Sequence, residues 1–139
     1  MTYSIVARDP ETGELGVAVQ SHWFSVGSIV TWARPGVGAV ATQANAEAAY
    51  GPDALALLAD GVPAPDALER LVAADPGRPS RLVAVVDAAG RVGAHTGPKC
   101  IACAGHVTGQ GVSCQATSWS PSGCGRPCSR RSAPRRTPR

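Results

Sequence analysis

The chain has 139 residues, of which 44% are hydrophobic and 17% charged, so it has the size of one globular domain and is neither collagen-like nor broadly disordered. No apolar run is long enough to cross a membrane and no signal-peptide pattern opens the chain, so we expect a soluble, cytoplasmic protein. Residues 1–116 carry ten acidic and seven basic side chains, whereas residues 117–139 carry six arginines and no acid. The net charge of +3 therefore comes from one end and is no argument for nucleic-acid binding.

Hydrophobic patterning and turn residues predict an alternation of strands and helices. In chain order they are strands at residues 3–8, 15–20, 29–32 and 37–42, helices opening at Pro52-Asp53 and Pro65-Asp66, and strands at residues 81–87, 91–96 and 112–116. Short turns such as residues 10–13 and 88–90 predict hairpins. The sequence therefore predicts an α+β domain with largely antiparallel sheets.

Residues 117–139 differ in character from the rest of the chain. They hold four prolines, five serines and six arginines, with no Leu, Ile or Val, so they cannot bury enough apolar surface to order themselves. We expect a disordered Arg/Pro/Ser-rich tail and interpret it as a frameshift product. One permitted set of codons, read from the third base of the Thr117 codon, encodes a strand end running into a helix. A natural basic tail is the alternative.

Seven segments together point to one protein family: residues 2–9 (TYSIVARD), 16–22 (GVAVQSH), 36–43 (GVGAVATQ), 50–52 (YGP), 86–91 (VDAAGR), 96–100 (TGPKC) and 104–106 (AGH). In this order they resemble domain-of-unknown-function family 1028, a bacterial family of the N-terminal-nucleophile (Ntn) hydrolase-like superfamily. The resemblance implies an Ntn-hydrolase-like αββα sandwich. Family members continue after Ala116 with a long helical segment that is absent here. We therefore expect residues 1–116 to be a partial domain, incomplete at its C-terminus by truncation or frameshift.

The resemblance makes Thr2 the main catalytic candidate. Ntn hydrolases use a hydroxyl or thiol at the mature N-terminus, with the free α-amine as the base. That amine has an ordinary pKa of about 8, which suits proton transfer near neutral pH. Removal of Met1 is expected before a residue as small as Thr2. Ser4 shares a strand face with Thr2 and is the second candidate hydroxyl. Without the resemblance, Thr2 is an ordinary strand residue.

Polar side chains at the ends of two predicted strands are candidates for substrate or oxyanion contacts. Gln20, Ser21 and His22 end the second strand, and Gln43 and Asn45 follow the fourth. Amide side chains of the Gln and Asn type donate hydrogen bonds to a tetrahedral oxyanion. Capping of strand ends and turns is their alternative role.

Three further side chains bear on the site. His95 and His106 are both expected to be structural, and His106, in an Ala-Gly-His segment, is the better candidate for a substrate contact. The single lysine, Lys99, comes late in the sequence, and nothing in the sequence places it near Thr2. This argues against a proteasome-type site, which has a lysine beside the nucleophile. Arg34 is the alternative source of positive charge.

The cysteines invite a zinc interpretation that we do not favour. Cys100 and Cys103 form one pair and Cys124 and Cys128 another, but the second pair lies in the tail and has three residues between its cysteines instead of two. We expect no metal site, and no disulfides in a cytoplasmic chain.

The resemblance, together with these candidate residues, implies an Ntn-type hydrolase acting on the carbon–nitrogen bond of an amide. Its substrate is expected to be a small molecule or peptide-like, and it is expected to use no cofactor. We expect a homo-oligomer without nucleic-acid or membrane partners. A non-catalytic binding or structural domain and an inactive truncated form are the alternatives.

Overall fold

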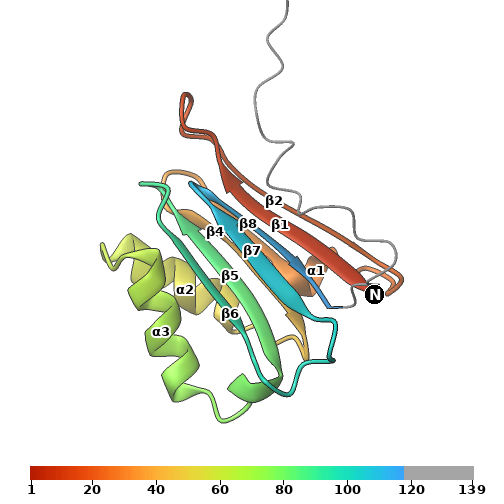
Figure 1. The fold of residues 1–139 in the computed structure, drawn as a ribbon. Coiled ribbons are helices and arrows are strands. Elements are labelled where there is room, and N and C mark those ends of the chain that lie inside the picture. The colour runs from red at the N-terminus through yellow and green to blue at the C-terminus, as the bar shows by residue number, and fades with distance from the viewer. Residues whose placement is uncertain (118–139) are drawn as a thin grey trace, which may run out of the picture.

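A computed structural model describes residues 1–117. Figure 1 shows its elements, which are β1 (Thr2–Arg8), β2 (Leu15–Ser21), α1 (Gly27–Val30), β3 (Thr31–Arg34), β4 (Gly38–Ala44), α2 (Tyr50–Ala59), α3 (Ala64–Ala74), the 3-10 turn η1 (Arg78–Ser80), β5 (Arg81–Asp87), β6 (Val92–Thr96), β7 (Gly105–Gly109) and β8 (Val112–Ala116). The predicted tail and its frameshift interpretation lie outside the described residues, apart from Thr117.

The strands form two antiparallel sheets, as the hairpin pattern predicts. One sheet has the order β2-β1-β8-β7 and the other β3-β4-β5-β6. Every neighbouring pair in both sheets is antiparallel. Figure 1 shows α2 and α3 on the β3–β6 sheet, on the side away from the second sheet. The α+β class and the stacked antiparallel sheets are thereby confirmed, and residues 1–117 form an α–β–β arrangement.

Two hydrophobic cores hold the layers together, and β4 and β5 contribute to both. Because side chains alternate across a strand, Val40, Val83 and Val85 face the helices. Ala39, Ala41, Ala84 and Val86 instead face the other sheet. All seven residues of β5 are buried, which explains its unbroken apolar run.

The two helices lie close to where the sequence predicts them. Asp53 lies in the first turn of α2 and Asp66 in that of α3, where a carboxylate interacts favourably with the helix dipole. Gly61 follows α2 with a φ of +85°, a conformation that glycine adopts without strain. No helix within residues 1–117 is long and apolar enough to cross a membrane.

One predicted strand was placed wrongly, and one observed strand was not predicted. The strand expected at residues 29–32 begins only at Thr31, because the preceding residues form the single turn α1. Local hydrogen bonds favour that turn: Ser28 Oγ donates to the Ser25 carbonyl at 2.7 Å, and Thr31 Oγ1 donates to the Gly27 carbonyl at 2.8 Å. Strand β7 was not predicted, because its glycine-rich sequence lacks apolar alternation.

Candidate active site

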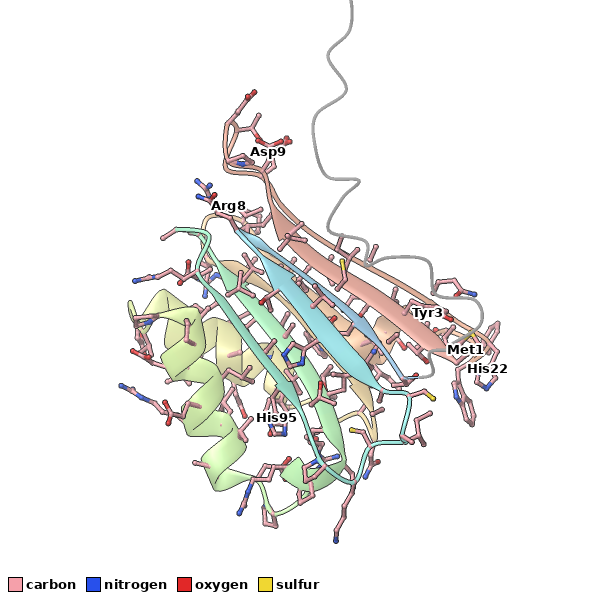
Figure 2. All side chains as sticks on the ribbon, viewed as in Figure 1. Met1, Tyr3, Arg8, Asp9, His22 and His95 are labelled. Carbon is pink, nitrogen blue, oxygen red and sulfur yellow. The ribbon has the colours of Figure 1, made fainter. Side chains whose placement is uncertain are left out.

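A cleft of about 470 Å³ opens at the end of the sandwich where β1 begins and β4 and β8 end. Figure 2 shows Met1 and His22 at this end, with Arg8 and Asp9 at the opposite end of the β1–β2 hairpin. Small-molecule sites have volumes of roughly 300–1,000 Å³. The walls come from the start of β1, the segment after β2, the end of β4 and the loop between β6 and β7. With Ser80 of η1 and Thr117 after β8, six segments distant in sequence meet at one cleft.

Thr2 lies in the wall of this cleft, on the face of β1 that points between the sheets. Its side chain is on the same face as that of Val6, a member of the inter-sheet core. Its Oγ1 shares a 2.9 Å hydrogen bond with Oγ of Ser21, which is directly opposite on β2. Its backbone N–H donates to Thr117 Oγ1 at 3.0 Å, and its carbonyl accepts from the Thr117 N–H at 3.0 Å. Thr2 is therefore held from both neighbouring strands.

Ser4 shares the strand face of Thr2, as expected, but lies deeper. Its Oγ donates a 2.6 Å hydrogen bond to Oε1 of Gln115, its cross-strand partner on β8. Gln115 is 2% exposed and its Nε2 has no partner, and neither does the buried Ser113 Oγ. Ser4 is thus engaged in the interior, whereas Thr2 lines the cleft.

Gln43 is the most unusual polar residue of the cleft. It lies within β4, on the same face as Ala41, and is 1% exposed. Neither Oε1 nor Nε2 has a hydrogen-bond partner among residues 1–117. An unpaired buried amide costs about 1–3 kcal/mol. Gln43 therefore presents an unused donor and acceptor in a cleft that it lines together with Thr2.

The backbone beside the cleft carries strain at two positions. Ala44, which follows Gln43 and lines the cleft, has a φ of +68°, and Ser25 in the segment after β2 has a φ of +54°. Non-glycine residues in this region cost about 1 kcal/mol or more each, and such strain concentrates at functional sites. The turn at Ala44 is where the chain leaves β4, so that Asn45 also lines the cleft.

Lys99 lines the same cleft as Thr2, which the sequence did not reveal. The loop after β6 brings it there, and hydrogen bonds to η1 and β5 fix that loop. The Gly97 N–H donates to the Arg81 carbonyl at 2.8 Å, and the Lys99 N–H donates to the Pro79 carbonyl at 2.6 Å. The sequence alone did not place a lysine near Thr2, but in the structure Lys99 and Thr2 line the same cleft.

Three other candidates do not line the cleft. His22 is exposed, and its Nδ1 is 2.9 Å from the Met1 amine. Gln20 is exposed on the opposite face of β2 from Ser21. Nδ1 of His106 on β7 is 2.7 Å from Thr96 Oγ1 on β6. Two effects lower the pKa of His106: mainly its partial burial, and also the charge of the nearby His95.

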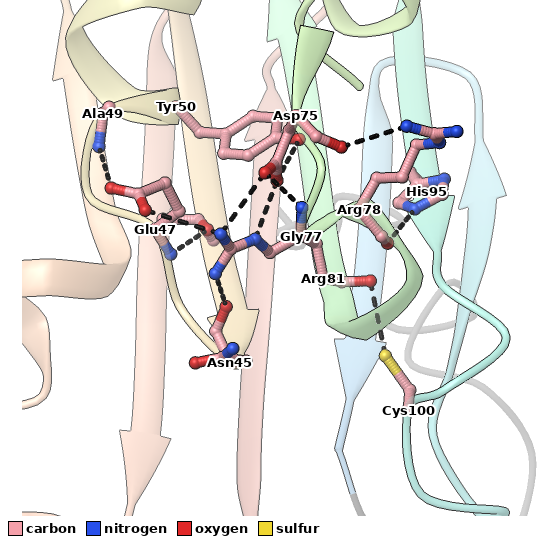
Figure 3. Close-up of polar contacts among 11 residues, drawn as sticks. Asn45, Glu47, Ala49, Tyr50, Asp75, Gly77, Arg78, Arg81, His95 and Cys100 are labelled. Carbon is pink, nitrogen blue, oxygen red and sulfur yellow. Dashed lines mark hydrogen bonds and ion pairs between the residues drawn. The ribbon is translucent and has the colours of Figure 1, made fainter. Parts of the chain in front are cut away.

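A partly buried network of ion pairs and hydrogen bonds centres on Arg81 (Figure 3). Arg81, at the start of β5, donates to the Asn45 carbonyl at 2.7 Å and to Asp75 at 2.8 Å, and it pairs with Glu47 at 3.5 Å. Its own carbonyl accepts a 3.3 Å hydrogen bond from Cys100 Sγ. Arg81 thereby connects the Asn45 segment to the loop that carries Cys100.

Replacing Arg81 by methionine should cost about 3 kcal/mol of unfolding free energy, because Asp75 keeps a largely buried charge without its partner. The hydrogen bond from Arg81, opposed by burial, lowers the pKa of Asp75 below its ordinary 3.8. The stability that this pair gives the folded protein is therefore fully present above pH 3.8 and is lost as the pH falls through the lowered pKa. Denaturant unfolding should therefore show that the difference in unfolding free energy between the unmodified protein and Arg81→Met shrinks below about pH 4.

The matched control for that measurement is Arg70→Met, because Arg70 is exposed and belongs to no ion pair among residues 1–117. Its replacement should change stability by less than about 0.5 kcal/mol. An equal effect of both replacements, at any pH, would show that the Arg81 network does not stabilise the fold.

The described cysteines form no metal site. Cys100 and Cys103 are free thiols. Within residues 1–117 no group of three or more His, Cys, Asp or Glu side chains is arranged to hold an ion. The zinc interpretation requires Cys124 and Cys128, which lie outside the described residues. Burial, partly offset by a backbone hydrogen bond, raises the pKa of the Cys100 thiol.

Sequence reasoning missed the apolar wall of the cleft. Trp23, Phe24 and Ile29 follow β2, and Ile101 lies in the β6–β7 loop. The pair Trp23-Phe24 directly after the polar Gln20–His22 segment was the available signal, because adjacent aromatic residues in a turn are rarely needed for a core.

The geometry defines a two-sheet α+β sandwich with a cleft at one end, lined by a threonine from the first strand. Over residues 2–120 the chain matches a family of unknown function, DUF1028, and it belongs to that family. A similar solved structure is the crystal structure of protein SPO2555 from Silicibacter pomeroyi, also described as DUF1028. The two share 33% sequence identity with a TM-score of 0.78, covering 82% of this chain and 53% of the other. This chain therefore spans about half the length of that relative. No curated protein matches the chain.

Proposed function

We propose that this chain is part of an Ntn-type hydrolase that cleaves the carbon–nitrogen bond of an amide, with Thr2 as the nucleophile. We further propose that residues 1–116 are the first part of a longer domain, an interpretation favoured by the 53% coverage of the solved relative.

In this mechanism, removal of Met1 frees the α-amine of Thr2. The amine takes the proton from Oγ1 as that oxygen attacks the amide carbonyl, and the protonated amine then delivers the proton to the leaving nitrogen. The carbon–nitrogen bond breaks, an ester forms on Thr2, and the product amine departs. Water then attacks the ester, with the α-amine again as base, releasing the carboxylic acid and restoring the Thr2 hydroxyl.

The observation that carries the proposal is the unpaired amide of Gln43 in the cleft that Thr2 also lines. When the carbonyl carbon becomes tetrahedral, its oxygen gains negative charge and needs a hydrogen-bond donor. Gln43 Nε2 is a buried donor held by a strand, so it is organised before the substrate arrives. Asn45, whose carbonyl is fixed by Arg81, is a second candidate donor from the same wall.

A non-catalytic binding domain is the second candidate, and the contacts of Met1 favour it. The Met1 amine is 2.9 Å from His22 Nδ1, and the Met1 carbonyl accepts a 3.3 Å hydrogen bond from Ser21 Oγ. A Met1 held in this way occupies the cleft wall and leaves Thr2 with an amide nitrogen instead of a basic amine.

Intact mass spectrometry after incubation with a β-lactone probe separates the two functions. The hydrolase should lack the mass of Met1 and gain one acyl group, which peptide mapping should place on Thr2. Thr2→Ala protein, treated identically, should lose Met1 but gain no acyl group. A protein that retains Met1 and acquires no adduct on Thr2 would be the binding domain instead.

A further inference from the structure

The apolar surface of the described residues is concentrated at the cleft. Of six large hydrophobic residues that are exposed in residues 1–117, all except Tyr3 line this cleft. Phe24 is 100% exposed, Trp23 70% and Ile101 60%. Scattered exposed apolar residues are normal, but a contiguous group around a concave surface marks a binding site.

The charge of the cleft has one sign. Among residues 1–117 no aspartate or glutamate lines it, and Lys99 is the only charged side chain that does. Lys99 forms no ion pair with any group in residues 1–117, while its backbone is tied to Pro79. An exposed, unpaired ammonium in an otherwise apolar and amide-lined cleft favours an anionic group in the ligand.

We infer that the cleft binds a small amide that carries an aromatic-sized apolar group and a carboxylate. The apolar group packs on Trp23 and Phe24, and the carboxylate interacts with Lys99. This inference takes the position of the amide beside Thr2 from the proposed function. It adds the two groups that the amide carries, an apolar group and a carboxylate.

A second copy of this chain would cover the same apolar residues, but it fits the observations less well. A flat apolar contact supplies no partner for the buried donor and acceptor of Gln43, whereas a small amide carries both a carbonyl and an N–H that could pair with them. The cleft volume of about 470 Å³ also suits a small molecule.

Binding is tested without turnover by calorimetry on the Thr2→Ala protein. N-phenylacetylglycine should bind about tenfold more tightly than N-acetylglycine, the factor expected from burying roughly 60 Å² of phenyl surface. It should also bind roughly threefold more tightly than the neutral N-phenylacetylglycinamide at low salt, because one solvent-exposed ion pair is lost. That second factor should shrink as salt is added.

Two variants assign each preference to its residue. Trp23→Ala should remove most of the phenyl preference, and Lys99→Met should abolish the carboxylate preference. Arg34→Met, which removes an exposed cation outside the cleft, should change neither.

The outcomes separate this inference from the proposed function. Equal affinity for all three compounds, or binding of none, overturns the inference. Loss of a concentration-dependent dimer in Trp23→Ala, without binding of any compound, identifies a second copy as the occupant. The predicted affinities together with no acyl adduct on Thr2 of the unmodified protein leave the ligand class standing and refute the hydrolase.

Discussion

Thr2→Ala should reduce hydrolysis of the 4-nitroanilides of acetic and phenylacetic acid by at least about a thousandfold, to the level of buffer alone. The reason is that the variant keeps the cleft, the free amine and the Gln43 amide but has no oxygen to form the ester. Thr2→Ser should retain measurable turnover, because its hydroxyl occupies the same position on β1. Release of 4-nitroaniline measures both.

The comparison is sharp because alanine and serine are both small enough to permit removal of Met1. Circular dichroism and thermal unfolding should show both variants folded, since loss of the Thr2 methyl and its bond to Ser21 costs only about 1 kcal/mol. Turnover by Thr2→Ala equal to that of the unmodified protein would remove Thr2 from the mechanism.

Gly97→Ala should destabilise the protein by about 3 kcal/mol, at the upper end of the range for overpacking. A Cβ on Gly97 would meet the carbonyl oxygens of Arg78 and Pro79, which are backbone atoms of η1 and cannot rotate away. The same loop positions Lys99 in the cleft, so the surviving folded protein should also lose its preference for a carboxylate. Denaturant unfolding and calorimetry measure the two effects.

Gly105→Ala provides the matched control, because it lies at the other end of the same loop, where an added Cβ would meet nothing within 4 Å. Its replacement should be neutral or stabilise the fold by up to about 1 kcal/mol, since alanine restricts the unfolded chain more than glycine does. If the two alanine variants prove equally stable, the close contact at Gly97 is not what fixes this loop.

Much of the fold was predictable because its signals are local. The strands at residues 81–87 and 112–116 were predicted at their observed limits, since unbroken apolar runs or regular alternation ended at turn residues. The starts of α2 and α3 were predicted from a proline followed directly by an aspartate, and both residues lie in the first turn of each helix. Hairpin turns then gave the antiparallel pairing.

The failures came from interactions that the pattern does not encode. At residues 27–30 side-chain hydrogen bonds to the backbone outweigh the β-propensity of Ile29 and Val30, so a turn forms where a strand was expected. The glycine-rich β7 is a strand only because β8 supplies a partner along its length.

The candidate site was partly predictable for the same reason. Thr2 was identified from the family resemblance and Gln43 from its place at the end of a predicted strand, and the structure brings both to one cleft. Lys99 and Ile101 were not, because their position depends on how η1 and β5 hold a distant loop, and no local pattern reports such a tertiary contact.

The position of β1 in the middle of its sheet has a consequence for the order in which the molecule is made. Thr2 leaves the ribosome well before its backbone partner Thr117, which lies 115 positions later in the chain. One edge of β1 pairs with β2 at once, whereas the other edge waits for β8. Contacts of such long sequence separation form late and slowly. The end of the cleft that holds Thr2 is therefore among the last parts of residues 1–117 to be completed, so a nascent chain cannot display this end of the cleft before residue 117 has emerged.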